Sequence, residues 1–155
     1  MQRPEYQPAY HDAFPSAMPK DGWQRHEIHE RTEISELARQ LEAAMGALGY
    51  PRKDTFAVAL ALREAAINAL QHGNRGDATR SVVIACHLSA TEVLLEVADE
   101  GRGFDPYLAP NPLVNDRFRN RPAGRGLFLI RVYMSWIRFN RRGNRAILCK
   151  RRSPD

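Results

Sequence analysis

Three polar side chains, spaced four residues apart, lie in an alanine- and leucine-rich stretch near the middle of the chain. Glu64, Asn68 and His72 would lie along one stripe of a helix, because residues at i and i+4 share a helix face. A carboxylate, an amide and an imidazole offer a proton acceptor and several hydrogen-bonding groups. A solvated helix face has the same pattern, so the stripe alone leaves both interpretations open.

A second group follows a hydrophobic strand-like run, in the sequence DEGRGFDP from Asp99 to Pro106. Gly101 and Gly103 would let backbone approach a ligand closely, and Asp99 can accept a hydrogen bond inside a pocket. A carboxylate beside glycines can recognise an amino group. The alternative is a glycine-rich turn capped by an aspartate.

A third group, Gly124-Arg125-Gly126-Leu127, is expected to open a helix. Free N–H groups, the positive end of the helix dipole and the guanidinium of Arg125 would then converge where an anion could bind. The surrounding sequence matches neither the GxxxxGK[ST] phosphate loop nor a GxGxxG turn within a βαβ unit.

The elements that must position these groups follow from hydrophobic periodicity and from the placement of glycine and proline. The pattern predicts helices over 30–48, 53–72 and 127–134, and strands over 23–29, 81–88, 92–99, 135–140 and 145–150. The first helix carries its apolar residues at spacings of three and four: Ile34, Leu37, Ala38, Leu41, Ala44, Met45 and Leu48. Short polar links indicate that strands 81–88 and 92–99, and the last two strands, form antiparallel hairpins.

Two segments fall outside these elements. Residues 1–22 contain four prolines and few branched aliphatic residues, so we expect a flexible N-terminal arm ahead of one folded domain over 23–152. The segment 100–124 is rich in glycine and proline and too long for a simple connection, which predicts a lid over a binding site.

Size and composition limit the possible functions. A chain of 155 residues with 43% hydrophobic residues predicts one globular domain. No apolar run is long enough for a membrane span and no secretory signal begins the sequence, so we expect a cytoplasmic protein. Cys86 and Cys149 are too few for a disulfide framework and are expected to pack as small apolar side chains.

Charge is distributed unevenly along the chain. Residues 117–152 hold 12 basic and no acidic side chains, whereas residues 1–116 hold 11 basic and 17 acidic ones. This basic quarter could attract nucleic acid, a membrane, an acidic protein or nucleotide phosphates. Trp136 and Phe139 alternate with arginines, which in a strand indicates aromatics packed inward rather than a nucleic-acid surface. His26 and His29 lack partners at metal-ligand spacing, so no transition-metal site is expected.

In order, E-x-x-x-N-A-x-x-H, D-x-G-x-G-F and G-R-G-L resemble the N, G1 and G2 boxes of the GHKL ATPases. The segments ALREAAINALQHGN, VADEGRGFDP and GRGLFLIR are most similar to the anti-sigma-factor serine/threonine kinases of bacterial partner-switching systems. The resemblance covers about residues 23–150. It implies a two-layer α/β sandwich of the Bergerat type, with a mixed, mostly antiparallel sheet, helices on one face and ATP held beneath a lid.

The resemblance also assigns roles to residues. Glu64 would be the general base of phosphoryl transfer, and Asn68 would be an oxygen ligand to Mg²⁺. Asp99 would bind the adenine amino group, which favours adenine over guanine. Further nucleotide-binding positions would be Gly101 and Gly103 beside the base and ribose, Gly124, Arg125, Gly126 and Leu127 around the phosphates, and His72. Arg117, Arg119 and Arg121 could add positive charge from the lid. His72 could instead only hydrogen-bond terminal helix carbonyls.

The activity implied is phosphorylation by Mg²⁺-ATP of a serine on a STAS-domain anti-anti-sigma protein, with a kinase homodimer capturing a sigma factor. Two alternatives use the same motifs: a regulator that binds ATP without phosphorylating its partner, and the catalytic piece of a histidine kinase. The histidine-kinase alternative is disfavoured because the sequence predicts no long helical hairpin with an acceptor histidine ahead of the N box. Direct nucleic-acid binding would require affinity for duplex that falls steeply with salt.

Overall fold

The structure, a computed structural model, describes residues 22–103 and 122–155. The predicted N-terminal arm, apart from Gly22, and most of the predicted lid lie outside the described residues. The same holds for the lid residues Arg117, Arg119 and Arg121. The side chains of residues 122–125 also lie outside the description, although the backbone there is helical.

The helices and strands occur in the predicted order. The helices are α1 (Arg31–Ala47), α2 (Arg52–Asn68), the π-helix η1 (Ala69–Gly73) and α3 (Pro122–Tyr133). The strands are β1 (Trp23–Ile28), β2 (Val82–Leu88), β3 (Glu92–Ala98), β4 (Trp136–Phe139) and β5 (Arg145–Arg151). Both predicted hairpins are confirmed, because β2 pairs with β3 and β4 pairs with β5, each antiparallel.

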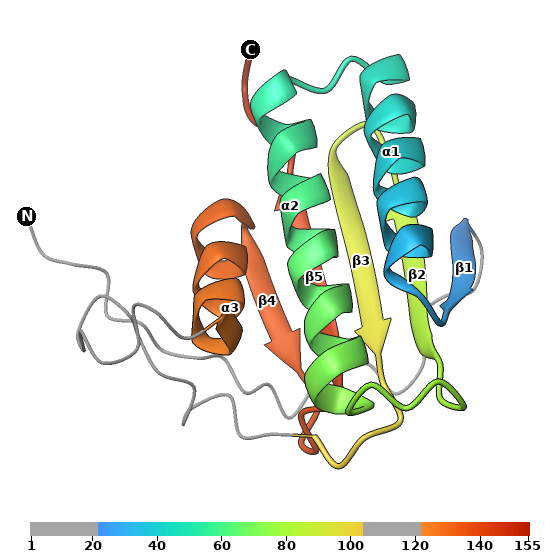
Figure 1. The fold of residues 1–155 in the computed structure, drawn as a ribbon. Helices are drawn as coiled ribbons and strands as arrows, with labels where there is room; N and C mark the ends of the chain where they lie inside the picture. Colours follow the sequence, from blue (N-terminus) through green and yellow to red (C-terminus); the bar gives the residue numbers. More distant parts are fainter. Residues whose placement is uncertain (1–21, 104–121) are drawn as a thin grey trace, which may run out of the picture.

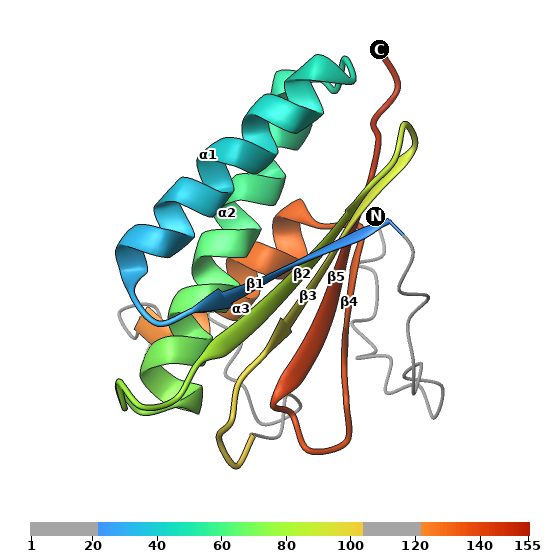
Figure 2. The same cartoon turned by 90° about the vertical axis from the view of Figure 1, so that its right-hand side faces the viewer.

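The five strands form one sheet in the order β1-β2-β3-β5-β4. Every pairing between these described strands is antiparallel, whereas the sequence analysis predicted a mixed, mostly antiparallel sheet. Figure 1 shows α1, α2 and α3 in front of the sheet, and Figure 2 shows all three on the same face. The predicted α/β sandwich with helices on one face is therefore confirmed.

The core lies between the helices and the sheet. Helix α1 turns a buried stripe toward the sheet, made of Ile34, Leu37, Ala38, Leu41 and Met45. Two residues of the predicted apolar stripe, Ala44 and Leu48, are exposed instead. Helix α1 ends at Ala47, so Leu48 is its C-cap and no longer follows the helical stripe. The Glu33 carboxylate accepts the backbone N–H of Glu30 and so fixes where α1 starts.

Helix α2 is buried along most of its length, with Val58, Ala61, Leu62 and Ala66 almost fully enclosed. Small alanines let α2 pack closely against both α1 and α3. Helix α2 is therefore the central element of the helical layer, and its last turns carry the polar stripe predicted from the sequence.

Cys86 and Cys149 are both buried and unpaired, as expected for cysteines that pack as apolar side chains. Burial raises the pKa of each thiol to about 12. Within residues 22–103 and 122–155, no helix has the length and apolar character that a membrane crossing requires.

Candidate functional site

The Glu64 carboxylate and the Asn68 amide lie against the backbone of α3 at Gly126. A β-carbon at position 126 would lie 2.7 Å from Glu64 Oε2 and 3.0 Å from Asn68 Nδ2. Gly126 is buried there, while Glu64 and Asn68 are half-buried. Only a residue without a side chain allows α3 to approach these polar groups so closely. The N-box and G2-box residues, some sixty positions apart in sequence, thus meet in the fold.

Helix α3 begins five residues earlier than predicted, at Pro122 rather than Leu127. The predicted lid boundary at position 124 is therefore wrong, because residues 122–124 already belong to the helix, whereas the prediction that a helix opens near Gly124 agrees with the structure. Proline is favoured in the first helical position because its missing N–H needs no partner there. Gly124 is in the first turn of α3, where backbone N–H groups lack intrahelical acceptors, but Gly126 lies beyond that turn. Leu127 is buried.

Asp99 lies just after β3, in a close contact with two glycines. A β-carbon on Gly73, at the end of η1, would collide with the Asp99 carboxylate, and one on Gly101 would collide with the carbonyl of Gly73. The Gly101 N–H donates to Asp99 Oδ1 at 2.8 Å. Burial raises the pKa of Asp99, and this hydrogen bond opposes the rise. Asp99 is thus a half-buried carboxylate with one oxygen already held by backbone.

Asn74 is a residue of this corner that sequence reasoning missed. Its side chain is 1% exposed and uses both polar atoms. Oδ1 accepts the N–H of Glu100 at 2.9 Å, and Nδ2 donates to the carbonyl of Ser81 at 2.9 Å. The Glu100 carboxylate in turn accepts the N–H of Ser81 at 2.8 Å. Asn74 therefore joins the end of η1, the start of β2 and the residue after Asp99.

The turn between β4 and β5 supports the same loop from the other side, and this too was missed. Asn144 accepts the N–H of Asp99 through its backbone carbonyl at 2.9 Å. Its side-chain amide lies 3.5 Å from the carbonyls of Asp99 and Gly101. Gly103 has a φ of +82° and packs directly on the backbone of Arg142, so a side chain would not fit there. Asn74 carried a weak sequence signal, since it lies two residues after the last residue of the N box.

His72 departs from the predicted stripe. The α-helical bonding of α2 ends at Asn68, and Ala69–Gly73 forms a π turn in which the Asn74 N–H donates to the carbonyl of Ala69 at 2.8 Å. A π turn holds more residues than an α turn, so the α-helical spacing that aligns Glu64 with Asn68 does not continue to His72. His72 is exposed. Its role as a nucleotide contact stays a prediction.

These residues fit a Mg²⁺-nucleotide. From Glu64 to Gly73 the chain runs through the last turn of α2 and the π turn of η1. One end of this stretch holds a carboxylate and an amide, and the other holds the Asp99 carboxylate packed against the backbone of Gly73. The described residues contain no cluster of three or more His, Cys, Asp or Glu side chains suited to a metal. Mg²⁺ does not need one, because it binds through few protein oxygens together with phosphate oxygens and water.

Comparison with known proteins gives the same family. A family model described as the histidine kinase-like ATPase domain matches residues 29–150, from the end of β1 to β5. This range includes all three motifs and nearly the whole described fold. No curated protein matches the chain. With residues 29–150 of its 155 matched by this model, the chain belongs to the histidine kinase-like ATPase domain family, of the GHKL type.

Proposed function

We propose that this protein is an ATP-dependent serine/threonine protein kinase that acts as an anti-sigma factor. The observation that carries the proposal is the close contact of Glu64 and Asn68 with Gly126. Asp99 lies against Gly73, at the end of η1, which continues α2. A carboxylate close to the phosphate-binding glycines is what a general base of phosphoryl transfer requires.

At the base end, the free oxygen of Asp99 would accept the adenine amino group while its other oxygen stays bonded to the Gly101 N–H. Gly73 and Gly101 let the Asp99 carboxylate and the backbone of η1 pack together, which holds the acceptor oxygen in place. An exocyclic amino group matches a carboxylate acceptor, whereas the carbonyl of guanine at the same place would repel it. The site therefore favours ATP over GTP.

At the phosphate end, Glu64 would take the proton of a serine or threonine hydroxyl as its oxygen attacks the γ-phosphorus of ATP. The new P–O bond forms as the bond to the β-phosphate oxygen breaks, so the products are a phosphoserine or phosphothreonine, ADP and one proton. Asn68 would hold Mg²⁺ by its amide oxygen, and the bound cation would neutralise charge on the phosphates. Gly124 and Arg125 would lie on the phosphate side.

The partners belong to the same proposal and rest on the sequence resemblance. The acceptor would be a STAS-domain anti-anti-sigma protein, and a homodimer of the kinase would hold a sigma factor until that partner displaces it. We place the protein in the cytoplasm, where both partners would be found. Direct contact with nucleic acid or with a membrane is not part of this function.

The test is transfer of phosphate from Mg²⁺-ATP to a candidate STAS partner by the full chain. Glu64→Gln should abolish transfer and leave ATP affinity, measured by calorimetry, within about threefold of wild type, since the amide keeps the shape of the carboxylate. Glu42→Gln is the matched control, because Glu42 makes only an exposed ion pair with Arg63 and should not alter transfer.

Each other outcome identifies a competing function. ATP binding by wild type without phosphate on any STAS protein would favour a non-catalytic regulator, and an acid-labile phosphate on histidine would favour a histidine-kinase activity. Duplex binding that falls steeply with salt and ignores ATP would favour nucleic-acid binding. Absence of binding heat in calorimetry with Mg²⁺-ATP would contradict the whole proposal.

A further inference from the structure

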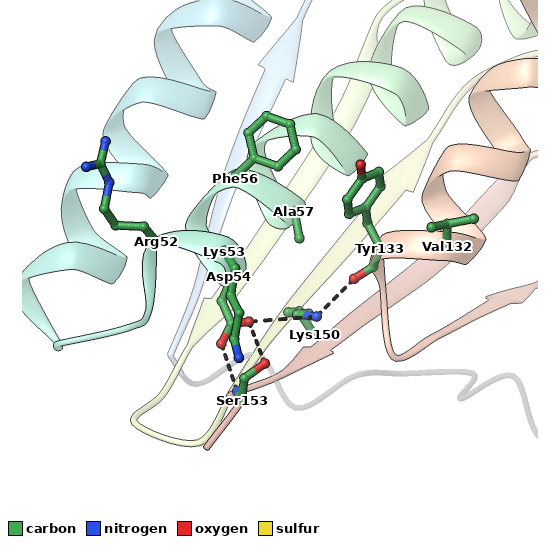
Figure 3. Close-up of a pocket in the computed structure, with 9 residues that line it drawn as sticks. All are labelled: Arg52, Lys53, Asp54, Phe56, Ala57, Val132, Tyr133, Lys150 and Ser153. Carbon is green, nitrogen blue, oxygen red and sulfur yellow. Dashed lines mark hydrogen bonds and ion pairs between the residues drawn. The ribbon is translucent and has the colours of Figure 1, made fainter. Parts of the chain in front are cut away.

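We propose that the end of the molecule opposite the nucleotide residues is a docking site for an acidic, amphipathic segment of a partner protein. A surface hollow of about 500 Å³ lies between the start of α2, the end of α3 and the last residues of the chain. Figure 3 shows its lining, with Phe56 on α2, Val132 and Tyr133 on α3, and Lys150 and Ser153 from the C-terminal segment. All of these residues lie in the described part of the chain.

The rim of the hollow is apolar and exposed. Phe56 and Val132 are each 58% exposed, more than any other large hydrophobic side chain in the part of the chain described. The Phe56 ring meets the edge of the Tyr133 ring, with centroids 5.7 Å apart. Two large apolar side chains beside a concavity indicate a surface that becomes buried when something binds. A leucine or phenylalanine anchor of a partner helix would fill such a hollow.

The floor of the hollow is polar, but its acidic group is already neutralised. The buried carboxylate of Asp54 accepts the Ser153 N–H at 2.8 Å and the Ser153 hydroxyl at 2.7 Å. Lys150 Nζ lies 3.8 Å from the same carboxylate and donates to the Tyr133 carbonyl at 3.0 Å. Figure 3 shows these bonds joining α2, α3 and the C-terminal segment. The floor is thus a fixed structure rather than a gap that closes when the helices shift.

The charge around the hollow selects the partner. Arg52 and Lys53 are exposed at the edge of the hollow, and Lys150 lies within it. Its lining therefore holds three basic groups and one carboxylate, that of Asp54, which already binds Ser153 and Lys150. The net positive field attracts acidic residues and steers their approach. An acidic helix with an apolar face complements both the rim and the charge.

The same features argue against other occupants. A second copy docking through this patch about a two-fold axis would bring Arg52 and Lys53 of each copy together, and like charges across an interface are unfavourable. A duplex or an anionic bilayer offers phosphates but no side chain to enter a concavity. A protein segment is the occupant that uses the hollow, the apolar rim and the charge together.

The docking site is separate from the nucleotide residues but not isolated from them. Phe56 precedes Glu64 by eight residues on α2, about 12 Å along the helix axis. Val132 and Tyr133 belong to the helix that contacts Glu64 through Gly126. The proposal does not depend on the kinase function, because the hollow would bind the segment whether or not phosphate is transferred.

The experiment uses the full chain, uniformly labelled with ¹⁵N, and a synthetic amphipathic peptide with a leucine and phenylalanine face and glutamates on the other face. Amide shifts should be concentrated at residues 52–57, 132–133 and 150–153. A peptide with lysines in place of the glutamates, and one with serines in place of the apolar face, should each bind at least about tenfold more weakly. A DNA duplex and vesicles of phosphatidylglycerol are included as competing probes.

Variants make the site assignment specific. Phe56→Ser and Lys53→Glu should each lower the affinity for the acidic peptide by about tenfold or more. Thermal unfolding should be unchanged, because both side chains are exposed. Leu48→Ser and Arg31→Glu are matched controls, since these residues are exposed but lie outside the hollow. Tighter binding of DNA or vesicles than of the acidic peptide, or peptide affinity that Phe56→Ser and Lys53→Glu leave intact, would overturn the proposal.

Discussion

Gly126 lies so close to Glu64 that a β-carbon at position 126 would come within 2.7 Å of the Oε2 atom of the carboxylate. The contact joins α3 to α2 at the two residues assigned to proton transfer and Mg²⁺ binding, Glu64 and Asn68. The groups that a methyl would meet are the free ends of two side chains, not backbone. They can therefore rotate away, which would preserve the fold but displace the groups that act on the phosphate.

Gly126→Ala should thus separate activity from stability. Alanine gains about 1 kcal/mol of helix propensity over glycine, which offsets the cost of moving two side-chain ends, so unfolding in urea should shift by less than about 1 kcal/mol. ATP turnover should fall by tenfold or more, because a misplacement of about 1 Å can cost up to a hundredfold. Gly46→Ala, in α1 where a β-carbon meets nothing within 4 Å, should be slightly stabilising with unchanged turnover. Full turnover in Gly126→Ala would show that the contact does not set the position of Glu64.

The buried amide of Asn74 gives a second prediction, on stability. Asn74→Ala removes the partner of the Glu100 N–H and of the Ser81 carbonyl in a partly buried place, and each such group costs about 1–3 kcal/mol when it stays without one. We expect a loss of about 2–4 kcal/mol in the free energy of unfolding by urea, together with weaker ATP binding, because Glu100 follows Asp99 directly. Thr79→Ala, in the same connection but exposed, should cost less than about 1 kcal/mol. Equal unfolding midpoints for the two variants would contradict the structural role of Asn74.

The elements that the sequence predicted well are those set by local pattern. Helix α2 has a long run of strong helix formers without a breaker, and the two hairpins have short polar links between branched residues. Glu64 and Asn68 were placed on one face because α-helical spacing holds over 64–68. The same spacing does not extend to His72, because the backbone bonding widens to a π turn just beyond Asn68, a change that the local sequence pattern did not predict.

The elements that the sequence predicted poorly depend on contacts between distant residues. Asn74 bonds to a residue 26 positions away, and Asn144 bonds to one 45 positions away, so local spacing does not connect them. The start of α3 was placed too late because Pro122 and Gly124 were assigned to the glycine- and proline-rich lid segment. Packing of α3 on α2 overrides the low helix propensity of glycine, since the close approach at Glu64 needs a glycine.

The two buried cysteines give a third prediction, on reactivity. Burial raises the pKa of Cys86 and Cys149 to about 12, so at pH 8 only about one thiol in ten thousand is a thiolate, the reactive form. A thiol-specific disulfide reagent should therefore titrate no thiol in the native protein and two in denaturant. A thiol of the native protein that reacts within minutes would indicate that the strand carrying it opens readily. The variants Cys86→Ala and Cys149→Ala would then show which of the two thiols reacted.

Asp99 gives a fourth prediction, on the pH dependence of stability. Burial raises the pKa of Asp99 above its ordinary value, despite the Gly101 N–H and the charges of Arg142 and Arg80. A carboxyl with a raised pKa in the folded state destabilises the fold once both states are ionised, and the penalty disappears below the unfolded pKa of about 4. Asp99→Asn keeps an oxygen for the Gly101 N–H but has no charge to desolvate. It should therefore unfold at a higher temperature than wild type at pH 7, and lose that advantage below about pH 4.

The same variant tests the nucleotide contact. An asparagine whose oxygen stays bonded to Gly101 presents an N–H₂ donor to the adenine amino group, so Mg²⁺-ATP should no longer raise the melting temperature of Asp99→Asn. Asp77→Asn is the opposite control. Hydrogen bonds from Thr79 lower the pKa of Asp77, so loss of the Asp77 charge should lower the melting temperature at pH 7 and leave the ATP-dependent shift intact. If Asp99→Asn melted below wild type at pH 7, burial of the Asp99 charge would not destabilise the fold. If it kept the full ATP-dependent shift, Asp99 would not be the acceptor for adenine.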